Sequence, residues 1–388
     1  MNHEFYMYRC LELAKLSTGY VAPNPLVGAV LVHHDKIIGE GYHQKFGETH
    51  AEVNCIASVK EEDKKLIPAS VLYVSLEPCS HVGKTPPCTD LIIRNKIPKV
   101  VIGSRDPFKE VYGKGIDQLK AAGVEVELVS GKFKKECEEL NKRFFTFHTK
   151  HRPYIILKWA QTADGFIAPL NLPERGTLDS DSFDKHYSVR KTDSDKATSL
   201  LSDSQNPPSE GREASRLLIS NEYSNRLVHK WRSEEASVLV GTNTALLDDP
   251  ELTTRRWPGP SPVRLVVDMD LKLPSSLKLF NGPVRTIVFN TIKHKEDGNL
   301  MFYQVGREAS LVHQVVNALY RLKIQSVLVE GGARLLQSFI NEEIWDEARI
   351  ITNEKMTVAN GLPAPVIENR TPVETMSFQA DKIEFYRS

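Results

Sequence analysis

The chain has 388 residues, with 50 Lys and Arg against 50 Asp and Glu, and 40% of the residues are hydrophobic. This length exceeds what one ordinary hydrophobic core needs, so we expect two domains. A net charge of zero and a pI near 7.2 argue against sequence-independent nucleic-acid binding, which needs a basic face. Five cysteines form a low and odd count, which disfavours a disulfide scaffold.

The hydrophobic pattern does not indicate a membrane or export. No apolar run approaches the roughly 20 residues that a membrane-spanning helix requires. Residues 1–16 lack a basic segment followed by an apolar stretch, so no secretory signal is visible. We therefore expect a soluble, reduced, cytoplasmic protein.

Helical and strand patterns alternate up to about Lys150, which is typical of an α/β domain whose sheet is covered by helices. The predicted helices are Phe5–Leu16, Ala51–Val59, Thr89–Lys96, Ile116–Ala122 and Lys134–Lys142. The predicted strands are Val27–Val32, Lys36–Gly41, Ala69–Leu76, Val100–Ile102 and Val124–Val129, the first two as a hairpin. We place this first domain at residues 1–147.

A second alternating series predicts an α/β domain at residues 151–388. Its predicted strands are Tyr154–Lys158, Ala236–Val240, Val263–Asp268, Thr286–Phe289 and Ser326–Val329, and its predicted helices are Asn221–Arg232, Leu311–Leu322 and Ala333–Ile340. Residues 170–213 interrupt the pattern with eight Ser and six Asp among only nine apolar side chains. Such a segment cannot bury a core of its own, so we expect an exposed, mobile insert.

Three potential metal ligands stand out: His50 and Cys88 at predicted helix starts, and Cys79 at the end of a predicted buried strand. Each cysteine follows a proline. One imidazole and two thiolates suit Zn²⁺ and leave the fourth tetrahedral position for water, whose pKa the metal lowers toward about 7. Glu52 lies two residues after His50, close enough to take a proton from that water and pass it to a departing amine. The sequence therefore predicts a catalytic zinc site.

The pattern is close to that of zinc nucleobase deaminases, H-x-E followed by P-C-x-x-C. Here, however, eight residues, Ser80–Pro87, separate the two cysteines. A purely structural zinc would need a fourth side-chain ligand and would not need Glu52. Cys10, Cys55 and Cys137 lie on predicted helical faces and are interpreted as ordinary thiols.

Three segments carry a specific resemblance: PNPLVGAV at 23–30, GETHAE at 47–52 and LEPCSHVGKTPPC at 76–88. They resemble the bacterial bifunctional riboflavin-biosynthesis deaminase/reductases, in which the longer spacer replaces the two-residue one. The resemblance implies a cytidine-deaminase-like three-layer α/β/α fold, with Asn24 and His43 on the pyrimidine and His81, Lys84 and Thr85 at the sugar phosphate. Asp106-Pro107-Phe108 departs from it, because Asn usually follows this Pro.

The second half contains no G-x-G-x-x-G fingerprint, but Val329-Glu330-Gly331-Gly332-Ala333 places two glycines between a strand and a helix. Such a turn lets backbone amides approach a pyrophosphate, although on its own it is more often plain turn chemistry. Together with LKWAQTADG at 157–165, VGTNT at 240–244 and DDPELT at 248–253, it resembles the reductase half of the same family. That half has a fold similar to dihydrofolate reductase.

The resemblance also implies the residues of this second site. The implied NADPH contacts are Ala160, Leu218, Thr244, Asp248, Met269, Gly332, Ala333, Arg334, Leu335, Leu336, Gln337 and Ser338. The implied substrate contacts are Arg216, Arg232, Leu252, Arg255 and Glu330. Guanidinium groups suit a phosphorylated ribose because they pair bidentately with phosphate. Arg232 has an alternative interpretation as a solvated charge near a helix end, and Ala163, Arg216 and Leu218 depart from the usual family residues.

The resemblance implies a two-step enzyme of riboflavin biosynthesis, with Zn²⁺ and NADPH as cofactors and Glu52 and Asp248 as catalytic residues. Its substrate would be a small pyrimidine ribosyl phosphate, and its relatives commonly assemble as homo-oligomers. Two alternatives stay open. A nucleic-acid deaminase with an accessory domain would show a basic channel, whereas a non-catalytic zinc and nucleotide-binding protein would tolerate Glu52→Gln.

Overall fold

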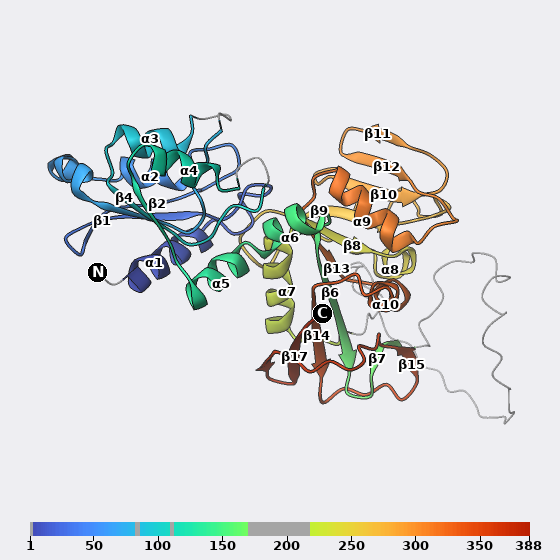
Figure 1. Cartoon of the computed structure of the whole chain (residues 1–388). Coiled ribbons are helices and arrows are strands. Elements are labelled where there is room, and N and C mark those ends of the chain that lie inside the picture. The colour runs from blue at the N-terminus through green and yellow to red at the C-terminus, as the bar shows by residue number, and fades with distance from the viewer. Residues whose placement is uncertain (1–2, 82–85, 109–111, 170–217) are drawn as a thin grey trace, which may run out of the picture.

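The computed structural model describes residues 3–81, 86–108, 112–169 and 218–388, which form two lobes side by side (Figure 1). Each lobe is built on its own β-sheet, one of five strands and one of ten. The polar insert predicted at 170–213 lies outside the described residues, as do Lys84, Thr85 and Arg216. Within the described ranges, no helix is long and apolar enough to cross a membrane.

The N-terminal sheet has the strand order β2-β1-β3-β4-β5. Its strands are β1 (Gly28–His33), β2 (Lys36–Tyr42), β3 (Val71–Val74), β4 (Lys99–Ile102) and β5 (Glu125–Leu128). β1 pairs antiparallel with β2 and β3, whereas β3, β4 and β5 are parallel. The carboxyl ends of β3 and β4 therefore open at the same edge, where ligands of α/β sheets usually bind.

Helices cover both faces of this sheet. They are α1 (His3–Lys15), α2 (Ala51–Ala57), α3 (Cys88–Arg94), α4 (Lys114–Ala121) and α5 (Gly131–Leu140), with a 3₁₀ segment η1 (Glu61–Ala69) before β3. One core cluster joins α2, α3 and α4 to the sheet, and another joins α1 and α5 to the opposite face. The expected three-layer α/β/α arrangement is confirmed.

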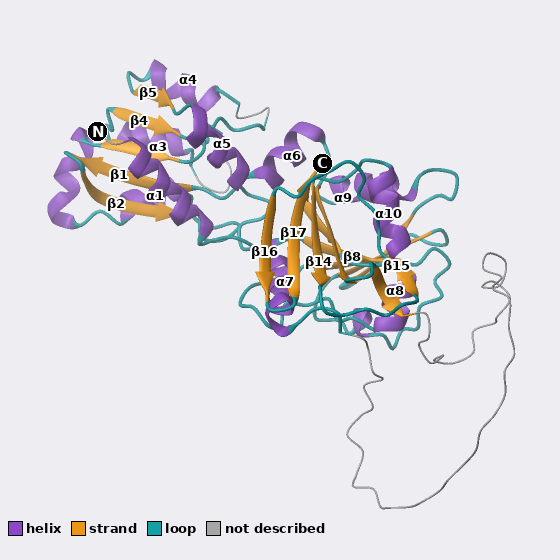
Figure 2. Cartoon of the chain, turned by 90° about the horizontal axis from the view of Figure 1, so that it is seen from below, coloured by secondary structure: helices purple, strands orange, loops and turns teal. Residues whose placement is uncertain are grey.

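The C-terminal sheet has the order β11-β12-β10-β9-β8-β13-β6-β14-β17-β16. Its strands are β6 (Tyr154–Thr162), β8 (Ser237–Val240), β9 (Val263–Val267), β10 (Thr286–Asn290), β11 (Lys295–Asp297), β12 (Leu300–Gln304), β13 (Ser326–Val329), β14 (Glu347–Asn353), β16 (Glu374–Phe378) and β17 (Asp381–Arg387). The central strands from β12 to β14 are parallel. β11, β17 and β16 add antiparallel edges, and Figure 2 shows the last two beside β14.

Helices also cover this second sheet on both faces. They are α7 (Glu222–Glu234), α8 (Thr242–Asp248), α9 (Leu311–Arg321) and α10 (Ala333–Asn341), with a 3₁₀ turn η3 (Lys278–Phe280). The largest core cluster packs α9 and α10 against one face, and two smaller clusters pack α7 and α8 against the other. β7 (Phe166–Pro169) and β15 (Gly361–Pro363) form a separate two-stranded sheet.

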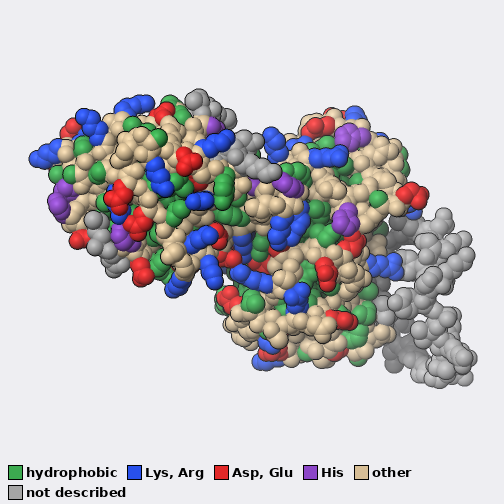
Figure 3. Space-filling view, in the orientation of Figure 1, with side chains coloured by type: hydrophobic (Ala, Val, Ile, Leu, Met, Phe, Trp, Pro, Cys, Tyr) green, Lys and Arg blue, Asp and Glu red, His purple; other side chains and the backbone are tan. Residues whose placement is uncertain are grey.

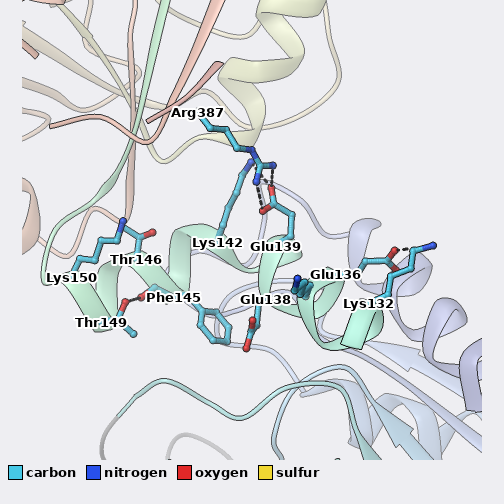
Figure 4. Close-up of a pocket in the computed structure, with 11 residues that line it drawn as sticks. Lys132, Glu136, Glu138, Glu139, Lys142, Phe145, Thr146, Thr149, Lys150 and Arg387 are labelled. Atoms are coloured by element: carbon cyan, nitrogen blue, oxygen red, sulfur yellow. Dashed lines mark hydrogen bonds and ion pairs between the residues drawn. The ribbon is translucent and has the colours of Figure 1, made fainter. Parts of the chain in front are cut away.

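The two lobes meet around α5 and α6 (Lys142–Lys150), a helix that the sequence pattern did not predict. Lys142 Nζ contacts Glu347 of β14 at 2.8 Å, and Arg143 pairs with the buried Glu235. Arg387 pairs with Glu139 at 2.7 Å at the rim of a groove of about 640 Å³ over α5 and α6 (Figure 4). None of the residues that line this groove belongs to either predicted site.

Candidate active sites

The three predicted metal ligands converge at the carboxyl edge of β3. His50 precedes α2, Cys79 follows β3, and Cys88 begins α3. His50 Nδ1 lies 3.5 Å from Cys79 Sγ and 3.4 Å from Cys88 Sγ. Zn–N distances of about 2.0–2.1 Å and Zn–S distances of about 2.3 Å, at a tetrahedral angle, put nitrogen and sulfur about 3.5–3.6 Å apart. The donor set therefore fits zinc in both chemistry and spacing.

The surroundings favour the thiolate form of Cys79. The neighbouring Cys88 thiol and His50 hold the pKa of Cys79 down to about 4, against the opposing effect of burial. The backbone N–H of Cys88, at the start of α3, also lies 3.4 Å from Cys79 Sγ. The local fold therefore holds Cys79 in the thiolate form, which is the form of cysteine that binds a metal ion.

Glu52 lies in the first turn of α2 with only 3% of its surface exposed. Burial raises the pKa of its carboxyl, and the charge of Cys79 adds to the effect. The carboxyl also interacts with the thiol of Cys88, which places it beside the ligand cluster although it is not one of the predicted ligands. This position suits a group that accepts a proton at the metal's open side.

Asn24 and His43, the predicted pyrimidine contacts, are joined by a hydrogen bond. His43 Nδ1 lies 3.0 Å from the carbonyl oxygen of Thr49, so this nitrogen donates. Nε2 of a neutral ring is then the acceptor for the Asn24 amide N–H, at 3.1 Å. Burial lowers the pKa of His43, which agrees with a neutral ring. The His43 ring lies 5.5 Å from that of His50, so the pair borders the metal cluster.

Glu77 is a residue of this site that sequence reasoning missed. Its buried carboxylate accepts hydrogen bonds from four backbone N–H groups between 3.1 and 3.3 Å, those of Asp106, Gly113, Gly115 and Ile116. It thereby holds the loop after β4 against the Pro78-Cys79 turn, where burial raises the pKa of Asp106 to about 7. A carboxylate at the end of a buried strand was the available signal.

His81 is exposed, two residues after Cys79. Lys84 and Thr85, its predicted companions at the sugar phosphate, lie outside the described residues. Of the predicted deaminase residues, the structure thus brings together Asn24, His43, Glu52 and the three ligands.

Replacing one thiolate tests the metal site directly. Cys88→Ser is expected to reduce bound zinc from one ion per chain to a small fraction, because a neutral hydroxyl replaces a thiolate in the donor set. Metal analysis after dialysis measures this, and Cys55→Ser, a buried thiol outside the cluster, serves as the control. Unchanged zinc content in Cys88→Ser would refute the assignment.

The second site lies where parallel neighbours β9, β8 and β13 end. Thr244 of α8 touches the Gly331-Gly332 turn after β13, and a Cβ at Gly331 would approach Thr244 Cγ2 to 2.7 Å. Gly332 has φ +78° and precedes α10, whose first N–H groups have no side-chain cap. Met269 follows β9 at the same edge. A close-packed glycine turn at a helix start fits a pyrophosphate, so the residues present fit a dinucleotide.

The other predicted NADPH contacts on α10 differ in their exposure and in their bonding within the chain. Ala333 begins α10, Leu335 packs near Gly241, and Arg334 is exposed. Leu336 is 1% exposed in the core, and the side chain of Gln337 bonds the backbone of Val366. Ser338 bonds the carbonyl of Arg334. The predicted contacts Leu336, Gln337 and Ser338 are thus engaged within the chain, so the glycine turn and the start of α10 are the part of this set that fits a cofactor.

Three further predicted residues lie on α8, on β6 and in the segment before α7. Asp248 is the last residue of α8, and Ala160 lies on β6 opposite Ile351 of β14. Leu218 is 65% exposed, next to Ile219, whose carbonyl accepts a hydrogen bond from Asn353. Leu218 and Ala160 thus both lie beside β14.

Arg232 and Glu330 form a buried bidentate ion pair. Arg232 Nε and one terminal nitrogen donate to the two carboxylate oxygens of Glu330, each at 2.6 Å. Burial alone would raise the pKa of Glu330, but the charge and hydrogen bonds of Arg232 lower it. With its side chain 12% exposed, Arg232 is not the solvated charge of the alternative interpretation. Its remaining nitrogen reaches the carbonyl of Thr253 at 3.4 Å.

The loop after α8 brings the other predicted substrate residues beside this pair. Leu252 is buried with φ +56°, and Arg255 pairs with Glu251 at 2.5 Å. The backbone N–H of Arg255 donates to Nδ1 of His229, a residue that the sequence analysis missed. Burial, together with Arg232 and Arg255, lowers the pKa of His229 to about 4.

This histidine predicts a pH dependence of stability. Burial and the nearby arginines lower the pKa of His229 in the folded chain from its ordinary value of 6.5 to about 4. The unfolded chain therefore binds more protons in this window, and stability falls as the pH drops from 6.5 toward 4. Between pH 6.5 and pH 4, the free energy of unfolding is expected to fall by about 1–3 kcal/mol more in the native chain than in His229→Gln. Denaturant titrations at the two pH values measure this difference. Equal losses would contradict a neutral, buried His229.

Comparisons with known proteins identify both halves of the chain. Residues 1–104 match the family model of the cytidine and deoxycytidylate deaminase zinc-binding region, and residues 204–357 match that of the RibD C-terminal domain. The riboflavin biosynthesis protein RibD of Aquifex aeolicus is 36% identical over 98% of this chain and 94% of its own length. A Buchnera aphidicola diaminohydroxyphosphoribosylamino-pyrimidine deaminase is 46% identical over 37% of this chain and 95% of its own length.

A solved structure shares the whole architecture. It is a Thermotoga maritima diaminohydroxyphosphoribosylaminopyrimidine deaminase/5-amino-6-(5-phosphoribosylamino)uracil reductase, similar with a TM-score of 0.79 and 31% identity. The similarity covers 99% of this chain and 98% of that one. The two predicted folds, cytidine-deaminase-like and dihydrofolate-reductase-like, are confirmed, with a zinc-binding first half and a second half of the NADPH-binding type. The chain belongs to the RibD family of bifunctional riboflavin-biosynthesis enzymes.

Proposed function

We propose that the chain carries out two successive steps on one pyrimidine ribosyl phosphate. The N-terminal lobe hydrolyses the 2-amino group of 2,5-diamino-6-(5-phosphoribosylamino)pyrimidin-4-one and releases ammonia. The C-terminal lobe reduces the ribosyl group of 5-amino-6-(5-phosphoribosylamino)uracil to ribityl. The observation that carries the proposal is the presence, in one chain, of the His50, Cys79 and Cys88 cluster beside Glu52 and of a separate glycine turn against Thr244.

In the deaminase lobe, His50, Cys79 and Cys88 would hold a zinc ion, which would supply a water of lowered pKa as the nucleophile near neutral pH. Glu52 accepts the proton of the attacking water and delivers it to the departing amine, so no net proton is consumed at the carboxyl. The Asn24 amide, oriented by its hydrogen bond with His43, contacts the pyrimidine edge. Burial of Glu52 and His43 keeps bulk water away from both groups.

In the reductase lobe, NADPH supplies the hydride, and the chain positions C1′ of the ribose against it. The Gly331-Gly332 turn, packed against Thr244, would hold the pyrophosphate through backbone N–H groups. Arg232 and Arg255 face the substrate, with Glu330 fixing the orientation of Arg232. Asp248 orients the substrate and cofactor or transfers a proton, at the end of α8.

The alternative of a nucleic-acid deaminase would require a basic channel. On the face that Figure 3 shows, Lys and Arg side chains are interspersed with Asp and Glu over both lobes. This mixture suits a small anionic substrate better than a phosphate backbone. We further propose that the protein is cytoplasmic and assembles as a homo-oligomer.

Separating the halves tests which lobe performs which step. Residues 1–147 are expected to release ammonia alone, and residues 151–388 to oxidise NADPH with the deaminated substrate alone, because each lobe owns a hydrophobic core. Ammonia release and NADPH absorbance measure the two steps. A folded 1–147 fragment that binds zinc but releases no ammonia would contradict the assignment.

A further inference from the structure

The loop that carries Asn24 joins α1 to β1 and lies at the boundary between the two lobes. Within its own lobe, the Asn24 N–H bonds the carbonyl of Val21 at 2.8 Å, and Phe46 N–H bonds that of Tyr20 at 3.1 Å. These contacts shape the turn but do not fix it against a rigid element. The Asn24 side chain is also bonded to His43 of the same lobe at 3.1 Å, and groups from farther along the chain hold the loop at other points.

Gln325 of the reductase lobe holds the loop at the residue next to Asn24. Its Nε2 donates to the carbonyl oxygen of Pro23 at 2.7 Å, and Gln325 is only 6% exposed. It stands between α9 and β13, and its own carbonyl accepts the N–H of Tyr154 at 2.8 Å. Gln325 is therefore held in place by the central strands β6 and β13 of the second sheet.

Two further contacts hold the same loop, one on each side of Pro23 in the sequence. Asn141, between α5 and α6 and 3% exposed, accepts from Leu26 N–H at 2.8 Å and donates to the Leu26 carbonyl at 2.9 Å. At the other end, Gly19 packs so closely on α7 that a Cβ there would lie 2.1 Å from the carbonyl oxygen of Ser233. The reductase lobe thus contacts the loop at two points, and the junction between the lobes contacts it at a third.

We propose that Gln325 is a positioning residue for the deaminase: from the reductase lobe it holds the 22–26 loop so that the Asn24 amide meets the pyrimidine. This inference rests on the proposed function, in particular on the contact of Asn24 with substrate. Losing the buried donor leaves the Pro23 carbonyl unsatisfied and loosens the loop at the residue next to Asn24, while the contacts of Asn141 and Gly19 remain. Because the proposed function assigns Asn24 to substrate binding and proton transfer to Glu52, the loss is expected to weaken substrate binding rather than the chemical step.

Gln325→Met in the full chain tests this inference, because Met has a similar length and no donor. The KM for ammonia release is expected to rise about 5- to 20-fold with kcat within about twofold, since one buried hydrogen bond is lost. Zinc content and reduction of supplied deaminated substrate are expected to stay as in the native chain. Arg387→Gln is the matched control, because it breaks an ion pair between the lobes that does not touch the loop (Figure 4).

A double-variant cycle separates positioning from a general structural effect. If Gln325 acts through Asn24, then Asn24→Ala combined with Gln325→Met raises KM no further than Asn24→Ala alone. Additive effects, an unchanged KM in Gln325→Met, or an equal loss of reduction would each overturn the inference. A native chain that releases no ammonia would instead overturn the proposed function, so the two failures are distinguishable.

Discussion

Glu52→Gln is expected to abolish deamination while the chain keeps its zinc and its reductase activity. The amide has nearly the volume of the carboxyl, so the buried position in α2 is filled as before. It cannot accept and return a proton, and proton transfer by a positioned side chain contributes about 10²- to 10⁴-fold. Ammonia release under saturating substrate is therefore expected to fall by at least two orders of magnitude.

The same variant carries its own controls. Zinc stoichiometry shows that the ligand cluster is intact, and NADPH oxidation with supplied deaminated substrate shows that the second lobe is folded. Glu40→Gln, a carboxylate of the same lobe that pairs with Arg9 away from the cluster, is expected to retain deamination. Substantial ammonia release by Glu52→Gln would remove Glu52 from the mechanism and favour a non-catalytic zinc.

Arg232→Met is expected to destabilise the reductase lobe and to stop reduction. Glu330 keeps its carboxylate buried, with a side-chain exposure of 6%, but loses both hydrogen bonds from the guanidinium. Removing one partner of a buried pair typically costs about 3–5 kcal/mol. Tryptophan fluorescence during denaturant unfolding measures this loss selectively, because Trp159, Trp231, Trp257 and Trp345 all lie in the second lobe.

Restoring the balance of charge tests the cause. Arg232→Met combined with Glu330→Met removes both charges and is expected to recover most of the lost stability without recovering reduction. An Arg232→Met chain as stable as the native one would show that the ion pair of Arg232 and Glu330 does not contribute to the stability of the lobe. Full reduction by the double variant would show that neither side chain takes part in substrate binding.

Local patterns predicted most of the secondary structure, because α2, α7 and α9 and the strands β1, β8 and β13 have clear periodicity. They missed β14, where Glu347 and Arg349 occupy buried positions of the strand and pair with each other at 2.6 Å. Two buried charges interrupt the apolar run that marks a central strand. The helix α6 was missed because the predicted helix Lys134–Lys142 runs through Asn141, where the structure ends α5 and begins α6.

The residues of the two sites likewise fall into those with a local sequence signal and those without one. The zinc ligands were predictable because each stands in a short local motif, His50 in His-x-Glu and the two cysteines directly after prolines. Glu77, His229 and Gln325 were not, since their partners Gly113, Arg255 and Pro23 are brought near only by tertiary folding. The pairing of Arg232 with Glu330, 98 residues apart, likewise had no local signal although both residues were predicted in the site.

The central claim is that one chain performs deamination before reduction, and product analysis of the full chain tests it most directly. Purified protein is incubated with the diaminopyrimidine ribosyl phosphate, with and without NADPH. Without NADPH, we predict one ammonia per substrate and accumulation of the deaminated ribosyl compound. With NADPH, we predict the ribityl product and one NADPH oxidised per ammonia released. NADPH oxidation without ammonia release, or ammonia release that NADPH never converts into ribityl product, would contradict the account.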